Sequence, residues 1–373
     1  MQIGIIKEQE TAQVALIPDV VKRMAEHHSV LVEKEAGASA FFADATYEEA
    51  GATLADQESI VSKVDLLVTV LPPPENILKQ LKENATVISS FKPFNDPAIA
   101  ENLAKYPISV FSMDMMPRTT IAQDKDVLSS MASIAGYKAV LTAANIMPRY
   151  FPMLSTAAGT IPPAKVLILG AGVAGLQAIA TAKRLGAVVE VFDTRSAVKE
   201  EVQSLGAKFV EVEGAKDDKD AGGYAVEQTE EYKKKQKDLI YDRITKSDVV
   251  ITTALLRGKK APILVTKAML DVMRPGSVII DLAAAGGGNC EVTENNQTVT
   301  YNNIYVVGNS TLEATVPMHA SQLFAKNIFN FLKVMVTENE FDLDFDNQMI
   351  KETCLVYQGK QMYGVQETEH ANS

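Results

Sequence analysis

The stretch KVLILGAGVAG, residues 165–175, decides the fold that this chain must adopt. An apolar run of strand type leads into glycines at positions 170, 172 and 175, and a helical pattern follows. In such a unit Gly170 permits the tight turn, Gly172 lets a pyrophosphate approach the backbone, and Gly175 lets the helix pack against the strand. The amino end of that helix then faces the phosphates. The stretch therefore predicts a dinucleotide site in a Rossmann-type domain.

An acidic residue follows the glycine loop at the expected place. Asp193 comes directly after the next apolar run, VVEVF at 188–192, where its carboxylate can accept hydrogen bonds from the adenosine ribose. The same charge repels a 2′-phosphate, which favours NAD(H) over NADP(H), and Arg195 is the residue that could soften this preference. The candidate cofactor site further includes Val173, Thr194, Ala254 and Leu255. A glycine-rich turn without a ligand stays open as the alternative.

Short apolar runs alternate with helical patterns along the chain. A first series lies at residues 3–6, 29–32, 65–71, 85–90 and 108–111, and a second at 165–169, 188–192, 248–253, 277–282 and 304–307. Continuous apolar strands separated by helices indicate parallel βαβ units. The sequence therefore predicts an α/β fold with two doubly wound parallel-sheet Rossmann-like domains, joined by two long helices at 129–145 and 322–334.

The two joining helices set the expected domain boundaries. The N-terminal Rossmann-like domain is discontinuous and takes residues 1–126 and 320–373, because the second helix returns the chain to it. The NAD(H)-binding Rossmann domain takes residues 127–319 and includes the first joining helix. The tail from Thr353 onward gives no pattern that predicts a structure.

A polar insertion at residues 213–238 is far longer than a strand-to-helix connection needs. One interpretation is a mobile lid, since long loops in compact domains are often functional. The other is a solvated insertion followed by a charged surface helix. Tyr224, an aromatic residue directly after Gly223, favours the lid.

Composition limits the functions that the chain can have. It has 373 residues, 47% of them hydrophobic, and a formal net charge of -11. Such a surface repels nucleic acid and anionic lipid, whereas a docked protein partner is compatible with it. No signal-peptide pattern is found, and no run approaches the ~18 consecutive apolar residues of a membrane span. The two cysteines, Cys290 and Cys354, and the four histidines show no metal-ligand spacing, so we expect no metal site and a reducing, cytoplasmic location.

A polar loop just before the first joining helix forms a second candidate site. The segment 113–130 presents Arg118, Gln123, Asp126 and Ser129. The alternative is an ordinary capped helix start with Asp126 at the N-cap. A dehydrogenase that acts on an alcohol or an amine also needs a poised acid or base. Among the histidines only His319 lies near a domain junction, and a structural role is favoured for it.

Six segments that together span nearly the whole chain carry a family resemblance. They are KE-x5-VALIP, R-x4-Q-x2-D with LSSMASIAGYKAV, PPAKVLILGAGVAG, GGYAVE, VITTALLRGKKAP and DLAAAGGGNCE. The chain resembles the alanine dehydrogenase/transhydrogenase family, and within it the separate NAD(H)-binding component of proton-translocating NAD(P) transhydrogenases. The resemblance implies a Re/Si-specific enzyme component that passes a hydride directly from NADH to NADP⁺ on a partner subunit, while a separate membrane portion translocates protons.

The resemblance also assigns roles in the polar loop. Arg118, Gln123 and Asp126 would be the catalytic loop that holds the nicotinamide end of NADH against the ring of NADP⁺. Ser129 would contact the carboxamide region. Ile121 stands where relatives often carry a second arginine, which leaves the details of nicotinamide binding open.

For the second domain, the resemblance implies that Gly223 and Tyr224 lie in a mobile loop that closes over bound nucleotide, and that Asp193 takes the adenosine ribose. The implied partners are an NADP(H)-binding beta subunit and a membrane-spanning subunit, and the implied assembly of this chain is a homodimer. Membrane contact would occur only through those subunits, on the cytoplasmic side of the inner membrane.

Alanine dehydrogenases of the same family need groups that this chain lacks. Gln13 stands for their substrate-binding arginine, Thr69 for their catalytic lysine and Lys92 for their catalytic histidine. Transfer of a hydride from one nicotinamide to another needs no acid or base, so these changes favour the transhydrogenase. An NAD-dependent amino-acid dehydrogenase and a non-catalytic NADH sensor stay open as alternatives.

Overall fold

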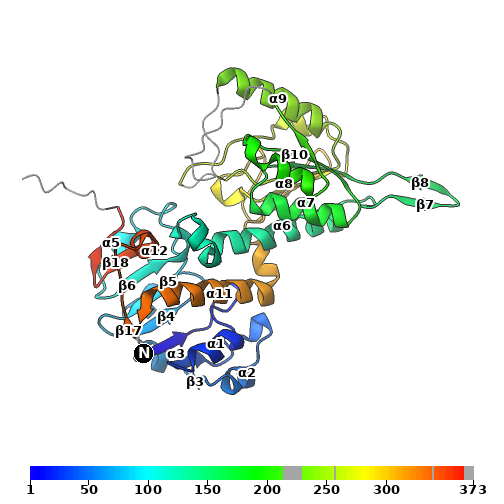
Figure 1. Cartoon of the computed structure of the whole chain (residues 1–373). Helices are drawn as coiled ribbons and strands as arrows, with labels where there is room; N and C mark the ends of the chain where they lie inside the picture. The colour runs from blue at the N-terminus through cyan, green and yellow to red at the C-terminus, as the bar shows by residue number, and fades with distance from the viewer. Residues whose placement is uncertain (213–228, 256–257, 338–339, 365–373) are drawn as a thin grey trace, which may run out of the picture. The chain divides into compact units, whose positions relative to one another are not determined.

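The computed structural model describes residues 1–212, 229–255, 258–337 and 340–364 and divides into two compact units (Figure 1). Unit 1 comprises Met1–Met131 together with Ala314–Ser373, and unit 2 comprises Ala132–Glu313. Each unit is built on its own sheet of mainly parallel strands.

The unit 1 sheet contains six parallel strands in the spatial order β3-β2-β1-β4-β5-β6, followed by antiparallel β18 and β19. Numbered along the chain, this is the Rossmann order 3-2-1-4-5-6, which reverses direction between β1 and β4. The strands are β1 Gln2–Ile5, β2 Ser29–Glu33, β3 Thr53–Ala55, β4 Leu66–Val68, β5 Thr86–Ser89, β6 Ser109–Ser112, β18 Cys354–Tyr357 and β19 Lys360–Gln361.

Helices bury both faces of the unit 1 sheet. In β4, Leu66 and Val68 pack in one core cluster, while Leu67 packs in another, as the alternation of a strand requires. The first cluster includes residues of α1 Pro18–Met24, α2 Asp44–Glu49, α11 Pro317–Met335 and α12 Gln348–Thr353. The second includes residues of α3 Gln57–Val61, α4 Glu75–Leu78 and α5 Ile99–Leu103. Short elements complete unit 1: η1 Ala38–Ala40, η2 Met113–Met115, η3 Thr120–Lys125, β16 Val336–Thr337 and β17 Glu340–Phe341.

The unit 2 sheet repeats the same plan, in the order β11-β10-β9-β12-β13-β15 with antiparallel β14 at the edge. Its order reverses between β9 and β12, and ligands of such sheets bind outside the carboxyl ends of the strands at this point. The strands are β9 Lys165–Leu169, β10 Val188–Phe192, β11 Lys208–Val210, β12 Val249–Thr252, β13 Val278–Asp281, β14 Thr298–Tyr301 and β15 Ile304–Val307.

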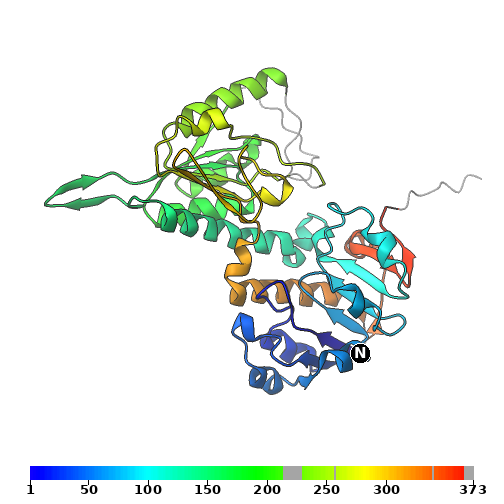
Figure 2. The same ribbon diagram turned by 180° about the vertical axis from the view of Figure 1, so that it is seen from behind.

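The helices of unit 2 also cover both faces of the sheet. Residues of α6 Val127–Ile146, α7 Val173–Arg184 and α8 Lys199–Ser204 pack on one face, and residues of α9 Glu230–Ile244 and α10 Lys267–Leu270 on the other. The short turns of this unit are η4 Ser196–Val198 and η5 Ala284–Gly286, and η6 Leu312–Thr315 spans the boundary between the units. A hairpin of β7 Leu154–Thr156 and β8 Gly159–Ile161 extends away from the rest of unit 2 (Figure 2).

These two sheets confirm the predicted α/β fold with two Rossmann-like domains. Five elements were not predicted: the short strands β3 and β11, the antiparallel strand β14, the hairpin β7–β8 and the C-terminal pair β18–β19. The last pair corrects the expectation that the tail from Thr353 has no pattern, because β18 extends the unit 1 sheet beside β6.

Helix α6 carries the chain from unit 1 into unit 2, with the boundary between Met131 and Ala132. Val127 belongs to the core of unit 1, whereas Ala139 and Val140 belong to the core of unit 2. An 18-residue window of α6 has a mean hydropathy of 1.3, so by length and composition it is the one helix of the described ranges that could cross a membrane. A core helix of a globular protein passes the same test, and a single such helix is therefore weak support for a membrane span.

Glu8 lies just after β1, at the carboxyl edge of the unit 1 sheet. Its carboxylate accepts hydrogen bonds from the backbone N–H groups of Val70 (2.5 Å) and Leu71 (3.4 Å), which follow β4. Burial raises the pKa of Glu8 from 4.5 to about 7, against the opposing effect of these two bonds. Because the pKa is higher in the folded protein, the stability that this proton contributes is full below pH 4.5 and is lost as the pH rises through 7.

We expect the substitution Glu8→Gln to remove this component of the pH dependence. Between pH 5 and 8 the free energy of unfolding of the wild type should fall by up to about 3 kcal/mol more than that of E8Q. Denaturant unfolding of both proteins at several pH values measures the difference. Parallel curves would show that Glu8 has an ordinary pKa.

Candidate nucleotide site

The glycine loop of unit 2 has the geometry that the sequence predicts. Gly170 has a φ of 107°, a left-handed conformation that favours glycine, and a Cβ at Gly175 would stand 2.0 Å from the carbonyl oxygen of Gly170. A Cβ at Gly172, in contrast, would meet nothing within 4 Å. Gly172 precedes the first residue of α7, so open space lies where a pyrophosphate would approach the helix.

Asp193 lies beside this loop at the end of β10. Its carboxylate accepts hydrogen bonds from the backbone N–H of Ala171 (2.7 Å) and from the backbone N–H of Arg195 (2.8 Å). The Arg195 guanidinium donates to both oxygens, from Nε at 2.9 Å and from Nη2 at 2.8 Å. Hydrogen bonding to Asp193 raises the pKa of Arg195, although burial opposes the shift.

This two-pronged pair means that Asp193 has a charged partner within its own loop. The Asp193 side chain is only 6% exposed, and that of Arg195 is 26% exposed. The sequence predicts the acid and names Arg195, but their direct pairing follows from the fold. Val173 and Leu255 are exposed, and Thr194 and Ala254 are half-buried, so the remaining predicted contacts lie at the surface around the loop.

The segment after β12 joins this edge of the sheet. The Thr253 hydroxyl donates toward the carbonyl oxygens of Gly170 (3.1 Å) and Leu169 (3.3 Å). Ala254 is held in turn by the side chain of Asn289, which comes from the turn after β13. The sequence analysis assigned no role to Thr253 or Asn289, although both lie in segments that match the family.

The predicted lid lies mainly outside the described residues. Gly223 and Tyr224 fall in the range 213–228, for which the structure gives no placement. The end of the insertion forms the charged helix α9, which begins after Thr229 and buries Tyr232, Ile240 and Ile244.

The polar loop with Arg118 belongs to unit 1. Arg118 and Gln123 are exposed, and Gln123 lies on η3. The backbone of this turn is fixed through the carbonyl oxygen of Asp124, which accepts hydrogen bonds from the Nδ2 groups of Asn327 (2.9 Å) and Asn330 (3.2 Å) of α11. The loop is therefore anchored by its backbone while its polar side chains face outward.

Asp126 differs from its neighbours because it is buried. Its carboxylate accepts hydrogen bonds from the backbone N–H (3.0 Å) and the hydroxyl (2.6 Å) of Ser129, so it caps the start of α6. The alternative of a capped helix start is thus correct as a local description. A capping role does not exclude contact with a ligand, since Ser129 is only half-buried.

The positions of the alanine dehydrogenase machinery hold no acid–base pair. Gln13 and Thr69 are buried in unit 1, and the Thr69 hydroxyl has no hydrogen-bond partner. Lys92 is exposed, with its backbone N–H bonded to Asp114. His319 is exposed on α11, and His370 lies outside the described residues. Within the described ranges, no group of three or more His, Cys, Asp and Glu side chains could hold a metal ion.

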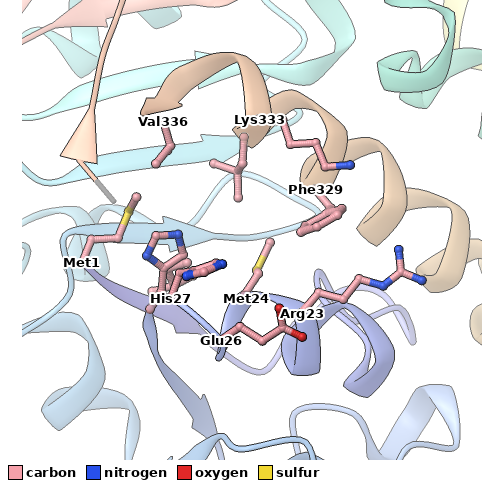
Figure 3. A pocket seen from close by; sticks show the side chains of 11 residues that line it. Met1, Arg23, Met24, Glu26, His27, Phe329, Lys333 and Val336 are labelled. Carbon is pink, nitrogen blue, oxygen red and sulfur yellow. The ribbon is translucent and has the colours of Figure 1, made fainter. Parts of the chain in front are cut away.

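Unit 1 has a separate cavity of about 520 Å³ (Figure 3). It is lined by α1, by the histidines that follow this helix, and by α11, with Phe329 against the side chains of Arg23 and Lys333. None of the predicted nucleotide-site residues lines it. The chemical features of a dinucleotide site lie instead at the glycine loop of unit 2.

The Rossmann strand order, the glycine loop and the acid that follows β10 together define a dinucleotide-binding protein. Comparison with known protein families makes this class specific. The family model described as "Alanine dehydrogenase/PNT, N-terminal domain" matches residues 4–135, and the one described as "Alanine dehydrogenase/PNT, C-terminal domain" matches residues 139–364. The chain belongs to this alanine dehydrogenase/PNT family.

Individual relatives lie on both sides of the family. An NAD(P) transhydrogenase subunit alpha chain of Rhodospirillum rubrum is 42% identical over 373 aligned residues, which cover 96% of this chain and 97% of the relative. The crystal structure of transhydrogenase from Sinorhizobium meliloti has a TM-score of 0.89 and 40% identity, over 97% of this chain and all of that one. Alanine dehydrogenase of Staphylococcus epidermidis is 29% identical, over 85% of this chain and 82% of its own. These relatives support an NAD-binding oxidoreductase component of the transhydrogenase type.

Proposed function

We propose that this chain is the NADH-binding subunit of a proton-translocating, Re/Si-specific NAD(P) transhydrogenase. One observation carries the proposal: a formed nucleotide loop in unit 2 occurs together with Gln13, Thr69 and Lys92 where an amino-acid dehydrogenase needs its arginine, lysine and histidine. The identity to transhydrogenase subunits supports the same choice. Bound NADH supplies the hydride, and the chain supplies binding, alignment and exclusion of water.

In this proposal the glycine loop holds the nucleotide. The amino end of α7 and the open space at Gly172 receive the pyrophosphate. Asp193 accepts hydrogen bonds from the adenosine ribose, with Arg195 as the group that shares its carboxylate. Val173, Thr194, Ala254 and Leu255 provide further contacts, and Gly223 and Tyr224 close over the bound nucleotide.

The polar loop of unit 1 acts on the reacting end. Arg118, Gln123 and Asp126 hold the nicotinamide of NADH against that of NADP⁺ on a partner subunit, and Ser129 contacts the carboxamide. The anchored backbone of η3 supports this role, because a rigid turn holds exposed side chains in a fixed geometry. Hydride transfer between two nicotinamide rings then requires alignment at near-contact distance and no proton transfer.

The partners follow from the same function. An NADP(H)-binding beta subunit accepts the hydride, and a membrane-spanning subunit couples the transfer to proton translocation. This chain is then peripheral to the cytoplasmic membrane and forms a homodimer. The hairpin β7–β8 supports the homodimer, because Met153 and Ile161 are exposed apolar side chains on an arm that extends away from its own unit.

The carboxylate of Asp193 should decide between NADH and NADPH. We expect Asp193→Asn to weaken NADH binding about tenfold or more, since a charged hydrogen-bond acceptor is lost, and to improve NADPH binding relative to NADH. Glu190→Gln is the matched control, because Glu190 lies on the same strand but pairs with Lys208. Nucleotide fluorescence titration measures both affinities, and an unchanged NADH affinity in D193N would remove Asp193 from the site.

The proposed activity is tested by mixing the full chain with the NADP(H)-binding domain of a related transhydrogenase. Hydride transfer between NADH and a spectrally distinct NADP⁺ analogue should require both proteins. Pyruvate with ammonium serves as the parallel substrate for the runner-up, an alanine dehydrogenase. Consumption of NADH by this chain alone with pyruvate and ammonium would favour that runner-up, and NADH binding without either reaction would favour an NADH sensor.

A further inference from the structure

A buried carboxylate organises the turn that follows β13. Asp281 is completely buried, and its Oδ2 accepts hydrogen bonds from the backbone N–H groups of Asn289 (2.7 Å) and Cys290 (3.0 Å) and from the Thr293 hydroxyl (2.6 Å). Its Oδ1 accepts from the Thr252 hydroxyl and the backbone N–H of Ala283, both at 3.0 Å. These five donors are neutral, and together they fix the turn that carries Asn289.

The side chain of Asn289 connects this turn to the segment after β12. Its Oδ1 accepts a hydrogen bond from the backbone N–H of Ala254 (3.0 Å), and its Nδ2 donates to the carbonyl oxygen of the same residue (2.9 Å). The Nδ2 group also donates to the carbonyl oxygen of Pro262 (2.8 Å). One completely buried side chain thus holds both Ala254 and Pro262 by their backbones.

The connection continues to the glycine loop. Ala254 follows Thr253, whose hydroxyl donates toward the carbonyl oxygen of Gly170 at 3.1 Å. The contact is close, since a Cβ at Gly170 would stand 2.3 Å from that hydroxyl oxygen. The polar backbone groups of Ala254 are satisfied by Asn289, so Ala254 and Leu255 meet a ligand mainly through their side chains.

We propose that Asn289 is a positioning residue for nucleotide binding: held by Asp281, it fixes the backbone of Ala254 beside the glycine loop, and Thr253 completes the link to Gly170. This inference rests on the proposed binding of NADH at the loop. The substrate is not touched by Asn289, which acts through Thr253, Ala254 and Leu255. Without it, the wall formed by these residues shifts relative to the glycine loop, and NADH binds less tightly.

The test compares Asn289→Ala with Asn295→Ala, a control at an exposed position of the same unit. The dissociation constant of NADH, measured by fluorescence with the full chain alone, should rise about tenfold in N289A and stay unchanged in N295A. With the NADP(H)-binding partner added, the KM for NADH should rise by a similar factor while kcat changes less than about twofold. A purely structural role would instead lower the fraction of active protein and leave KM unchanged.

A second pair of variants keeps the test informative if N289A does not fold. Thr253→Val removes the hydroxyl at nearly the same volume and should weaken NADH binding, whereas Thr253→Ser keeps the hydroxyl and should restore it. Equal affinities for T253V, T253S and wild type would overturn the proposed link. The binding measurement uses this chain alone, so a failure of hydride transfer with the partner would count against the proposed function and not against the positioning role.

Discussion

Replacing Gly175 by alanine is expected to abolish NADH binding and to destabilise unit 2. The new Cβ would stand 2.0 Å from the carbonyl oxygen of Gly170, a backbone atom that cannot rotate away. Helix α7 must therefore move from the loop, and its N-terminal N–H groups lose their alignment with the pyrophosphate. We expect the dissociation constant of NADH to rise about a hundredfold or more, and the free energy of unfolding to fall by about 1–3 kcal/mol.

Gly172→Ala is the matched control for this variant. Its added Cβ meets nothing within 4 Å and its φ of -78° suits alanine, so the protein should keep the stability of the wild type. NADH binding should nevertheless weaken, because the methyl group occupies the space that the pyrophosphate needs. Calorimetry and fluorescence titration separate the two effects. If G175A bound NADH within a few-fold of the wild type, the loop would not be the pyrophosphate site.

The second large effect is expected in the polar loop of unit 1. Arg118→Ala and Gln123→Asn should each slow hydride transfer about a hundredfold, because small errors in the alignment of reacting groups cost rate steeply. The fold should be unaffected, since both side chains are exposed and the turn is anchored by the carbonyl oxygen of Asp124. Stopped-flow measurement of transfer to an NADP⁺ analogue, with NADH saturating, reports the chemical step.

Thr120→Ala supplies the control for the loop variants, because Thr120 is exposed on the same turn. It should transfer hydride at the rate of the wild type. A rate in R118A or Q123N within about threefold of the wild type would remove that residue from the reacting end. A lower affinity for NADH with an unchanged rate at saturation would place the residue in binding only.

The glycine loop could be predicted from the sequence because its constraints are local. Gly170 and Gly175 are needed within one strand, turn and helix, so the pattern of residues 165–175 carries the whole geometry. The same holds for the buried strands, whose apolar runs need no knowledge of distant residues. Asp193 also follows from its place after β10.

Features that depend on distant contacts could not be predicted. Strand β18 forms only because Cys354–Tyr357 meets the edge of β6, more than 200 residues earlier in the chain. Asn289 gains its role from hydrogen bonds to Ala254 and Pro262, which the fold brings beside it. The fork between Arg195 and Asp193 is local in sequence, but the choice between pairing and solvent exposure depends on the burial of the carboxylate.

Direct transfer of the hydride is the central claim, and isotope retention tests it most directly. NADH that carries deuterium at the transferred C4 position is mixed in ordinary water with NADP⁺, the full chain and the NADP(H)-binding partner domain, and the NADPH is analysed by mass spectrometry. The proposed function predicts that each NADPH carries one deuterium, because the hydride passes between the rings without exchange. NADPH without deuterium, or no NADPH while NADH binds normally, would contradict it.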